Sequence, residues 1–321
     1  MRKLFNIVWM ASVILALASC QHKELCYDHS HVINVDITFD WTKAPDAQAE
    51  SMSLYLFSED GTDPQRYEFV GKEGGTIRVV PGVYHAICLN SDTEEIAHRN
   101  TDHFSTYTLT TEATNLLAGM SSLGLVSSSA PRVKGTEDQS VKAPSEKLWT
   151  DQMTLVEFTE QTTEFTMAPK ATYSHVILEI LNVENLQYAA SVSGALSGLA
   201  DGYMIGLGEL SKGLATVPFP LIINMDENKV TGDFYTFGHC PAEMNTHIFT
   251  IYVIMRDGSK WYYTCDVTDK MHDADNHIIR ITIDTLPIPQ PQPDDPSEGG
   301  GGGGFMPTVD DWNTINIGIN M

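Results

Sequence analysis

This chain has few basic residues, few cysteines and no long hydrophobic run beyond its first twenty residues. Its 321 residues include 19 Lys and Arg against 42 Asp and Glu, which gives a formal net charge of −23. A charge of this size and sign argues against nucleic acid and anionic membrane surfaces as partners. None of the five cysteines belongs to a Cys-x-x-Cys pair, which excludes a zinc ribbon and a thioredoxin-like motif.

The chain also lacks the short motifs of several enzyme classes. It contains no Gly-x-Ser-x-Gly, no His-Glu-x-x-His and no Gly-rich phosphate loop. Gly206-Leu207-Gly208 has neither the later glycine nor the strand–helix context of a nucleotide-binding turn. We therefore expect no enzyme activity, no catalytic residue and no cofactor.

The first twenty residues have the form of a secretory signal peptide. Arg2 and Lys3 precede an apolar run of about a dozen residues from Ile7 to Ala18, whereas a membrane span needs roughly 20. The run ends in Leu17-Ala18-Ser19-Cys20, which resembles the lipobox of bacterial lipoproteins. The resemblance implies that residues 1–19 are removed and that Cys20 becomes the acylated first residue. Several acyl chains on Cys20 would anchor the protein stably in a membrane.

The start of the mature chain predicts where the protein is located. Removal of Arg2 and Lys3 with the signal peptide changes the net charge to −25. Gln21 follows the cysteine, so nothing indicates retention at an inner membrane, which an Asp would suggest. Residues 20–24 resemble the Lys/acidic export signal of surface lipoproteins in the Bacteroidetes. We predict a lipid-anchored outer-membrane protein that faces outward, with residues 20–31 as its tether.

Four cysteines remain beyond Cys20, namely Cys26, Cys88, Cys240 and Cys265. An even number in an oxidising compartment permits two disulfides, whose pairing the sequence leaves open. Cys88 and Cys265 stand in apolar and aromatic runs, so buried free thiols are the alternative.

Short β-branched and aromatic runs at close spacing predict an all-β sandwich in residues 32–168. Val35, Ile37 and Phe39 share one face of the first strand. Further strands are expected over 51–57, 66–70, 76–80, 83–89, 148–158 and 164–167, with Pro81-Gly82 as the turn between two of them. Residues 111–140 break the pattern, and we expect a short helix over 112–118 and a long loop there.

Ala168-Pro169-Lys170 marks the expected boundary to a second β-sandwich, residues 169–286. Its first strand is expected over 173–180 and its last over 277–283. Asp257-Gly258, between the apolar runs 247–255 and 260–267, is the strongest hairpin signal in the chain. Residues 192–201 are rich in Gly and Ser, and we expect an irregular edge there.

The composition changes again at the carboxy terminus. Residues 287–304 form a Pro- and Gly-rich linker that ends in six consecutive glycines, a flexible coil. In residues 305–321, Ile315, Ile317 and Ile319 alternate with polar residues. A disordered tail would not need this alternation, so the pattern predicts a tethered strand with one apolar face.

Five parts of the chain carry a family resemblance: residues 29–45, 74–84, 90–94, 182–186 and 192–198. They resemble an uncharacterised family of Bacteroidales lipoproteins related to fimbrillins, the subunits and anchors of type V pili. The resemblance covers nearly the whole mature chain. It implies two tandem transthyretin-like β-sandwich domains with a flexible C-terminal tail, and it brings no catalytic motif.

The resemblance also implies a mode of assembly. In that class of pili, a protease that cuts after Arg removes an amino-terminal strand, and a neighbour's carboxy-terminal strand fills the groove by β-augmentation. This chain has Lys43 but no Arg between its first two strands, which fits an anchor or accessory subunit that keeps its lipidated terminus. Ile315, Ile317 and Ile319 are candidate donor residues for strand exchange. The alternative is that their strand folds back and covers an edge of its own domain.

Two groups of residues could hold a metal ion, and in both the simpler interpretation is a solvated loop. His29 and His31 would share one face of a strand, but no third ligand is identifiable. Calcium could lie among four acidic residues, Asp266, Asp269, Asp273 and Asp275. The Gly and the terminal Glu of an EF-hand loop are absent, so we expect no metal site.

Aromatic residues leave a second function open. Trp261, Tyr262 and Tyr263 could stack on a sugar, although on a strand Tyr262 faces away from the other two. Core packing is the simpler interpretation, as it is for Trp41 and Trp149. The sequence therefore predicts an outer-membrane lipoprotein with a structural or adhesive role, as a fimbrial anchor, tip or accessory subunit that binds fimbrial subunits by β-strand addition. The alternative is a surface glycan-binding lipoprotein of a polysaccharide-uptake system, which an exposed, co-planar aromatic patch would favour.

Overall fold

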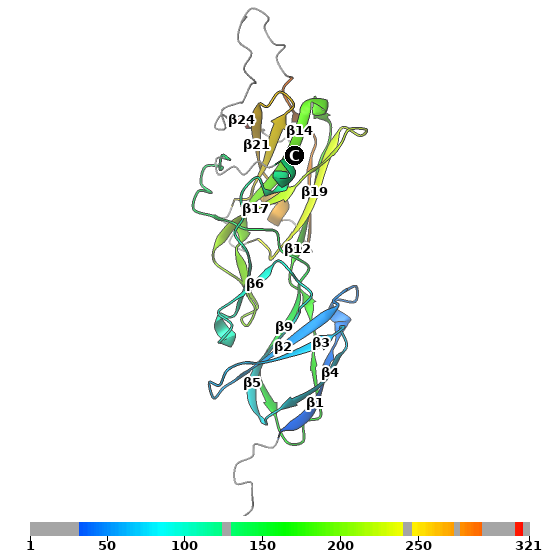
Figure 1. Ribbon diagram of the computed structural model, residues 1–321, viewed down its shortest axis with the longest axis vertical. Helices are drawn as coiled ribbons and strands as arrows, with labels where there is room; N and C mark the ends of the chain where they lie inside the picture. Colours follow the sequence, from blue (N-terminus) through cyan, green and yellow to red (C-terminus); the bar gives the residue numbers. More distant parts are fainter. Residues whose placement is uncertain (1–31, 124–129, 240–245, 273–276, 291–311, 317–321) are drawn as a thin grey trace, which may run out of the picture.

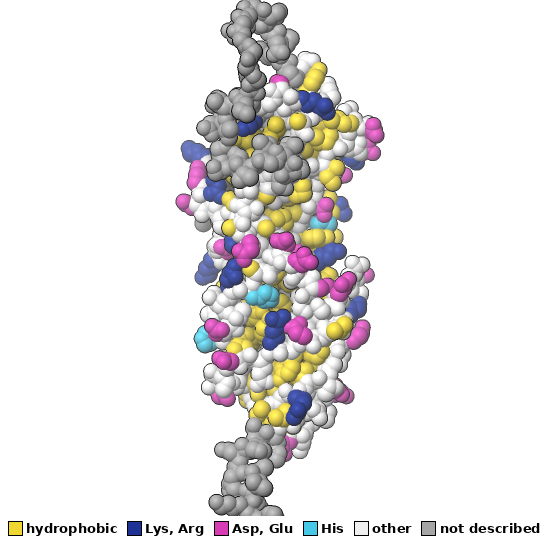
Figure 2. Space-filling view, viewed as in Figure 1, with side chains coloured by type: hydrophobic (Ala, Val, Ile, Leu, Met, Phe, Trp, Pro, Cys, Tyr) yellow, Lys and Arg dark blue, Asp and Glu magenta, His cyan; other side chains and the backbone are white. Residues whose placement is uncertain are grey.

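The computed structural model describes residues 32–123, 130–239, 246–272, 277–290 and 312–316, and nearly all of its regular structure is β-strand. The strands form two lobes stacked end to end along the long axis of the molecule (Figure 1). Acidic and basic side chains are interspersed over both lobes on the face seen in Figure 2, with apolar side chains between them. The predicted all-β class is confirmed. No helix in the described ranges has the length and apolar character needed to cross a membrane.

The lower lobe is a sandwich of two sheets. One sheet has the order β10-β1-β4, with β10 at Glu164–Met167, β1 at Ile33–Phe39 and β4 at Gly74–Val79. The other has the order β11-β9-β5-β2-β3, with β11 at Lys170–Ala171, β9 at Trp149–Phe158, β5 at Gly82–Asn90, β2 at Ser51–Ser58 and β3 at Gln65–Val70. Val35, Ile37 and Phe39 point into the core between the sheets, as their alternation predicts.

Pro81-Gly82 turns the chain from one sheet to the other. The expected strands on either side of it are present as β4 and β5, but β4 pairs with β1 whereas β5 pairs with β2 and β9. The turn therefore joins the two layers of the sandwich and does not close a hairpin.

A third sheet covers the outer face of β2 and β5. It has the order β16-β15-β7-β6, with β16 at Glu209–Leu210, β15 at Gly202–Met204, β7 at Thr108–Thr111 and β6 at Ile96–Arg99. Leu54 and Leu56 of β2 pack into the sandwich core, while Tyr55 and Phe57 pack into a separate core with Tyr107 and other residues of this third sheet. Burial on both faces explains why β2 is apolar without alternation.

The upper lobe is built around a six-stranded sheet of order β24-β21-β20-β14-β17-β8. Its strands are β24 (Trp312–Asn316), β21 (Lys260–Asp266), β20 (Ile248–Met255), β14 (Ala189–Ala200), β17 (Leu214–Pro220) and β8 (Ser140–Val141). The facing sheet has the order β18-β19-β12-β22, with β18 at Ile222–Asn224, β19 at Lys229–Thr236, β12 at Ser174–Ile180 and β22 at Ile278–Ile283. β13 (Val183–Glu184) and β23 (Leu286–Pro287) form a short parallel pair. The predicted hairpin around Asp257-Gly258 is confirmed as β20 and β21.

Two local predictions were wrong. Residues 192–201 do not form an irregular edge, because β14 pairs with β17 on one side and β20 on the other and is buried along most of its length. The helix expected over 112–118 is instead a 3-10 helix, η3 (Ala118–Leu123). Leu116, Leu117 and Met120 pack on the outer face of the six-stranded sheet, so tertiary burial decides where this turn of helix forms.

Short helical turns occupy a few connections elsewhere. They are η1 (Trp41–Lys43), η2 (Phe104–Thr106), η4 (Leu186–Tyr188) and α2 (Thr268–His272). The ring of Trp41 meets that of Trp149 edge to face at 6.4 Å, which agrees with the packing role expected for both.

Strands from both sides of residue 168 lie together. β8 pairs in parallel with β17, and β7 pairs with β15, so the segment from β6 to β8 joins strands of the second half of the chain. The division into domains at residues 168 and 169 stays a prediction. Cys88 and Cys265 are buried free thiols in separate cores, while Cys20, Cys26 and Cys240 lie outside the described residues.

Candidate assembly site

The carboxy-terminal strand β24 lies at the edge of the six-stranded sheet, parallel to β21 (Figure 1). Tyr262 is paired with Thr314, and Tyr263 with Ile315. The half-buried Ile315 side chain packs against the core of its own lobe. The described part of the segment therefore takes the fold-back position, while Ile317 and Ile319 lie outside the described residues.

Trp312 fixes the start of β24 on the opposite face of the sheet. Its ring meets that of Tyr252 edge to face at 5.4 Å, and Lys260 Nζ lies 5.9 Å from the centre of the indole. The indole Nε1 is buried without a hydrogen-bond partner among the described residues.

Strand β24 covers the edge of β21, which would otherwise be the last strand of the sheet. The Tyr263 hydroxyl donates to the Pro287 carbonyl oxygen at 3.1 Å, and burial raises the pKa of this phenol. Without β24, the backbone groups of β21 would form an open edge beside a buried aromatic core. A strand with apolar side chains at alternate positions is the complement of such an edge.

The aromatic residues of β21 do not form one platform. Tyr263 is buried in the core, while Tyr262 lies on the other face of the sheet with Tyr252, as the alternation predicts. Trp261 is half-buried against the same core as Tyr263. The large hydrophobic side chains exposed in the described ranges are all aliphatic: Val32, Val70, Met153, Leu155, Leu207, Ile222, Met225 and Ile278. The described residues therefore offer no exposed aromatic patch for a sugar.

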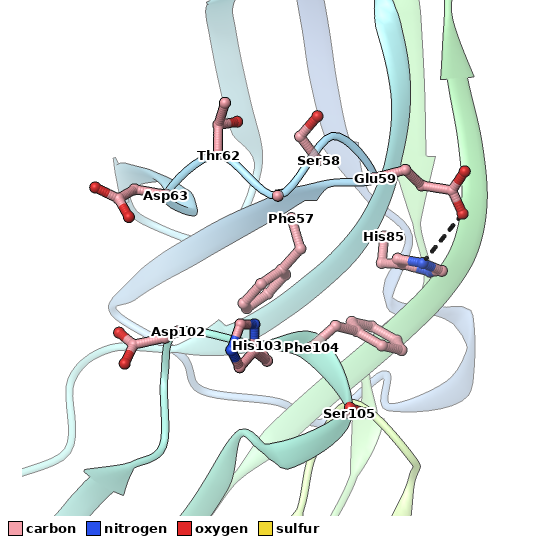
Figure 3. A pocket seen from close by; sticks show the side chains of 11 residues that line it. Phe57, Ser58, Glu59, Thr62, Asp63, His85, Asp102, His103, Phe104 and Ser105 are labelled. Atoms are coloured by element: carbon pink, nitrogen blue, oxygen red, sulfur yellow. Dashed lines mark ion pairs between the residues drawn. The ribbon is translucent and has the colours of Figure 1, made fainter.

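A cleft of about 600 Å³ opens beside β2, between the turn that follows it and η2 (Figure 3). His85 Nε2 lies 3.7 Å from Glu59 Oε1, and the His85 ring stacks on Phe104 with centroids 4.7 Å apart. Asp63 and Asp102 point outward (Figure 3). No hydrogen bond joins a serine of the cleft to a histidine in the described part of the chain, so the arrangement is not that of a nucleophile and its base.

One of the acidic residues considered for calcium, Asp266, caps the start of α2. Asp266 Oδ1 accepts hydrogen bonds from the backbone N and the hydroxyl of Thr268, at 3.0 and 2.5 Å, just before α2. Asp273, Asp275, His29 and His31 lie outside the described residues.

Three histidines that the sequence analysis did not single out lie together in the upper lobe. They are His239, His247 and His272, whose nearest ring nitrogens all lie within 4.8 Å of one another. Separations of 8 and 25 residues match no common ligand motif, so only the fold brings the three together.

The fold and the edge define a two-lobed β-sandwich protein whose sheet edge is closed by its own terminal strand. Residues 19–220 match the family described as "Domain of unknown function (DUF5119)", and the chain belongs to this family. It is similar to a Bacteroides ovatus protein named "Putative fimbrium anchoring subunit Fim4B". The two are 24% identical over 289 residues, which cover 85% of this chain and 81% of that protein.

Solved structures share the fold. A Bacteroides ovatus protein described as a "putative adhesin" superposes with a TM-score of 0.62 at 21% identity, over 82% of this chain and 94% of that one. A Bacteroides thetaiotaomicron structure described as "putative polysaccharide binding proteins" gives a TM-score of 0.50 at 9% identity, over 78% and 89%. With the named fimbrial relative, the family match confirms the resemblance to fimbrillin-related proteins that the sequence predicts.

Proposed function

We propose that this protein is a lipid-anchored, outward-facing outer-membrane protein that anchors a fimbrium, with a structural rather than a catalytic role. Its carboxy-terminal strand is the assembly element: it closes the β21 edge in the isolated chain and pairs with a fimbrial subunit in the assembled one. The observation that carries the proposal is the position of β24 at a sheet edge, paired over five residues.

The sequence relative supports the choice of an anchor. Its name is that of a fimbrium anchoring subunit, and the match extends over most of both chains. The lipobox-like Leu17-Ala18-Ser19-Cys20 gives this chain the means to hold a membrane, and the absence of Arg between β1 and β2 leaves the first strand attached to that anchor.

The arrangement of the lobes fits the same role. β1, which follows the proposed tether, lies in the lower lobe, and β24 lies in the upper one (Figure 1). A molecule held at Cys20 would therefore carry its assembly edge away from the membrane. We propose two domains, 32–168 and 169–286, which are joined by the pairing of β7 with β15 and of β8 with β17.

The shortness of the cis strand, which pairs with β21 over five residues, supports strand exchange at this edge. A partner's strand, or β24 inserted into a partner, restores the same backbone ladder with five or more residues. Ile317 and Ile319 would extend the apolar face of Ile315 in the trans complex.

A reversible lock tests the proposal. Tyr262→Cys with Thr314→Cys places two thiols on directly paired residues, whose Cα separation of about 5 Å suits a disulfide. The oxidised full chain should lose binding to purified fimbrial subunits by about tenfold or more, because the strand cannot leave β21. Reduction should restore binding.

The matched control is an edge pair in the facing sheet, Ile222→Cys with Thr231→Cys, which should bind equally when oxidised and reduced. Unchanged binding by the oxidised β21–β24 lock would refute the role of the terminal strand. Recovery of only a transporter partner from cell-surface extracts would refute the fimbrial role itself.

A further inference from the structure

Three imidazoles from three separate connections converge beside β14, near the start of β20. His239 follows β19 and forms an isolated bridge with Leu199, His247 directly precedes β20, and His272 ends α2. The His247 ring is nearly perpendicular to the other two, at 83° and 82°, with centroids 5.4 and 5.1 Å away. The rings of His239 and His272 face each other at 5.1 Å and 26°.

The fold fixes the orientation of His247. Its Nδ1 lies 3.2 Å from the Ser197 carbonyl oxygen, a geometry in which Nδ1–H donates and Nε2 keeps its lone pair. Metal-binding histidines commonly have this arrangement, because a hydrogen bond to the second nitrogen sets the tautomer and the ring orientation. The His247 side chain is fully buried, so the packing around it holds the ring in this orientation.

An irregularity in β14 makes room for this ring. The pairing of β14 with β17 shifts between Leu196 and Leu199, and Gly198 there has φ +80°. A Cβ on Gly198 would lie 2.8 Å from His247 Nδ1 and 2.6 Å from the Thr246 carbonyl oxygen. The Gly198 backbone N–H donates to Gln139 Oε1 at 3.0 Å, which holds the bulge in place.

The distance between two of the nitrogens suits a shared ion. His247 Nε2 and His272 Nε2 are 3.2 Å apart. Two imidazole nitrogens bound to one tetrahedral Zn²⁺ at 2.0–2.1 Å are separated by about 3.3 Å. The ligand nitrogen of His239 lies within 4.8 Å of both, on a residue that is only half-buried, so a small side-chain rotation completes the set.

We propose that His239, His247 and His272 form a binding site for a divalent late first-row metal ion, with Zn²⁺ as the ion best suited to three imidazoles. The partial exposure of His239 and the exposure of His272 leave the fourth position open to water. The ion would tie the end of β19, the start of β20 and the end of α2 together, and thereby stiffen the upper lobe that also carries β24.

Zinc titration of the chelator-treated full-length protein in detergent tests the site. We expect one equivalent of Zn²⁺ by calorimetry and by elemental analysis, and the intense visible bands of tetrahedral Co²⁺ when cobalt is used as the probe. At Zn²⁺ about 100-fold above its Kd, the melting temperature should rise by roughly 5 °C. Because His272 is exposed, His272→Gln should fold normally and lower the affinity by on the order of 100-fold or more.

His103→Gln is the matched control, since His103 is exposed and lies outside the cluster. It should bind Zn²⁺ like the wild type. The proposal is overturned if no stoichiometric Zn²⁺ binds, or if both His239→Gln and His272→Gln bind it as tightly as the wild type. The proposal is also overturned if a His29→Gln/His31→Gln variant, with the cluster intact, no longer binds Zn²⁺, because the ion would then be bound elsewhere.

Discussion

Gly194, in the middle of β14, gives the sharpest test of how the upper lobe is packed. A Cβ at this position would lie 2.8 Å from Phe219 Cζ and 2.9 Å from Phe249 Cε2. Both side chains are only 1% exposed, and their rings stack on each other with centroids 5.9 Å apart. The ring of Phe219 also stacks on that of Phe234, with centroids 4.4 Å apart. Gly194→Ala must therefore move a stack of three aromatic rings.

Two effects of this substitution oppose each other. Reduced freedom of the unfolded chain favours alanine by about 0.4–1 kcal/mol. Overpacking of a close-packed core typically costs about 1–3 kcal/mol. We expect a net loss of about 1–2 kcal/mol in the free energy of unfolding, which corresponds to a fall of roughly 3–6 °C in melting temperature.

Calorimetry and urea unfolding of the full chain provide the measurement. Gly75→Ala is the control: a Cβ on Gly75 would lie no closer than 3.4 Å to Phe69, so stability should change by less than about 0.5 kcal/mol. A second variant, Gly194→Ala with Phe249→Leu, should be less destabilised than the sum of its single changes, because the smaller side chain relieves the clash. A neutral or stabilising Gly194→Ala would refute the packing argument and would agree with the irregular edge that the sequence predicted for residues 192–201.

Two further predictions concern buried titratable groups. Burial raises the pKa of Cys265 to about 12 and that of Cys88 well above its ordinary value. A thiol reagent should therefore label both only after unfolding, which mass spectrometry of peptides will show; rapid labelling of either in the folded chain contradicts this. Burial also lowers the pKa of His98, whose Nδ1 lies within hydrogen-bond distance of the Tyr107 hydroxyl oxygen, at 2.6 Å. Just below pH 6.5, His98 therefore binds a proton in the unfolded chain but not in the folded one. The free energy of unfolding consequently falls as the pH decreases through that value. His98→Gln should reduce the difference between urea midpoints at about pH 7.5 and 5.5, and an unchanged difference would count against His98.

The sequence predicts most strands but not their partners. The alternation of Val35, Ile37 and Phe39 gives the face of β1 that is buried, and Asp257-Gly258 gives the β20–β21 hairpin. Pro81-Gly82 predicts a turn correctly, yet nothing local states that the two strands it joins belong to different sheets. Pairing over long separations is decided by tertiary packing, which a single sequence does not encode in its local pattern.

The errors arose where small residues have a structural purpose that depends on distant side chains. Residues 192–201 are rich in Gly and Ser, the composition of a loop, but Gly194 lies between two phenylalanines and Gly198 against a histidine. Likewise, the three histidines of the cluster come from connections that only the fold brings together. The fold-back position of β24 was one of two alternatives, because the alternation of Ile315, Ile317 and Ile319 fits a cis and a trans partner equally well.

The pairing of β1 has a mechanical consequence. This strand follows the proposed tether directly and lies in the centre of its sheet, with β10 paired to it over four residues and β4 over six. A tensile force applied at its amino end along the strand axis would load both ladders in shear, so that all of their hydrogen bonds resist together rather than opening one after another. In the proposed role at the base of a fimbrium, flow past the cell would put the fibre, and with it this strand, under tension. Strand β1, where that tension would enter the protein, is hydrogen-bonded to a neighbouring strand on each side.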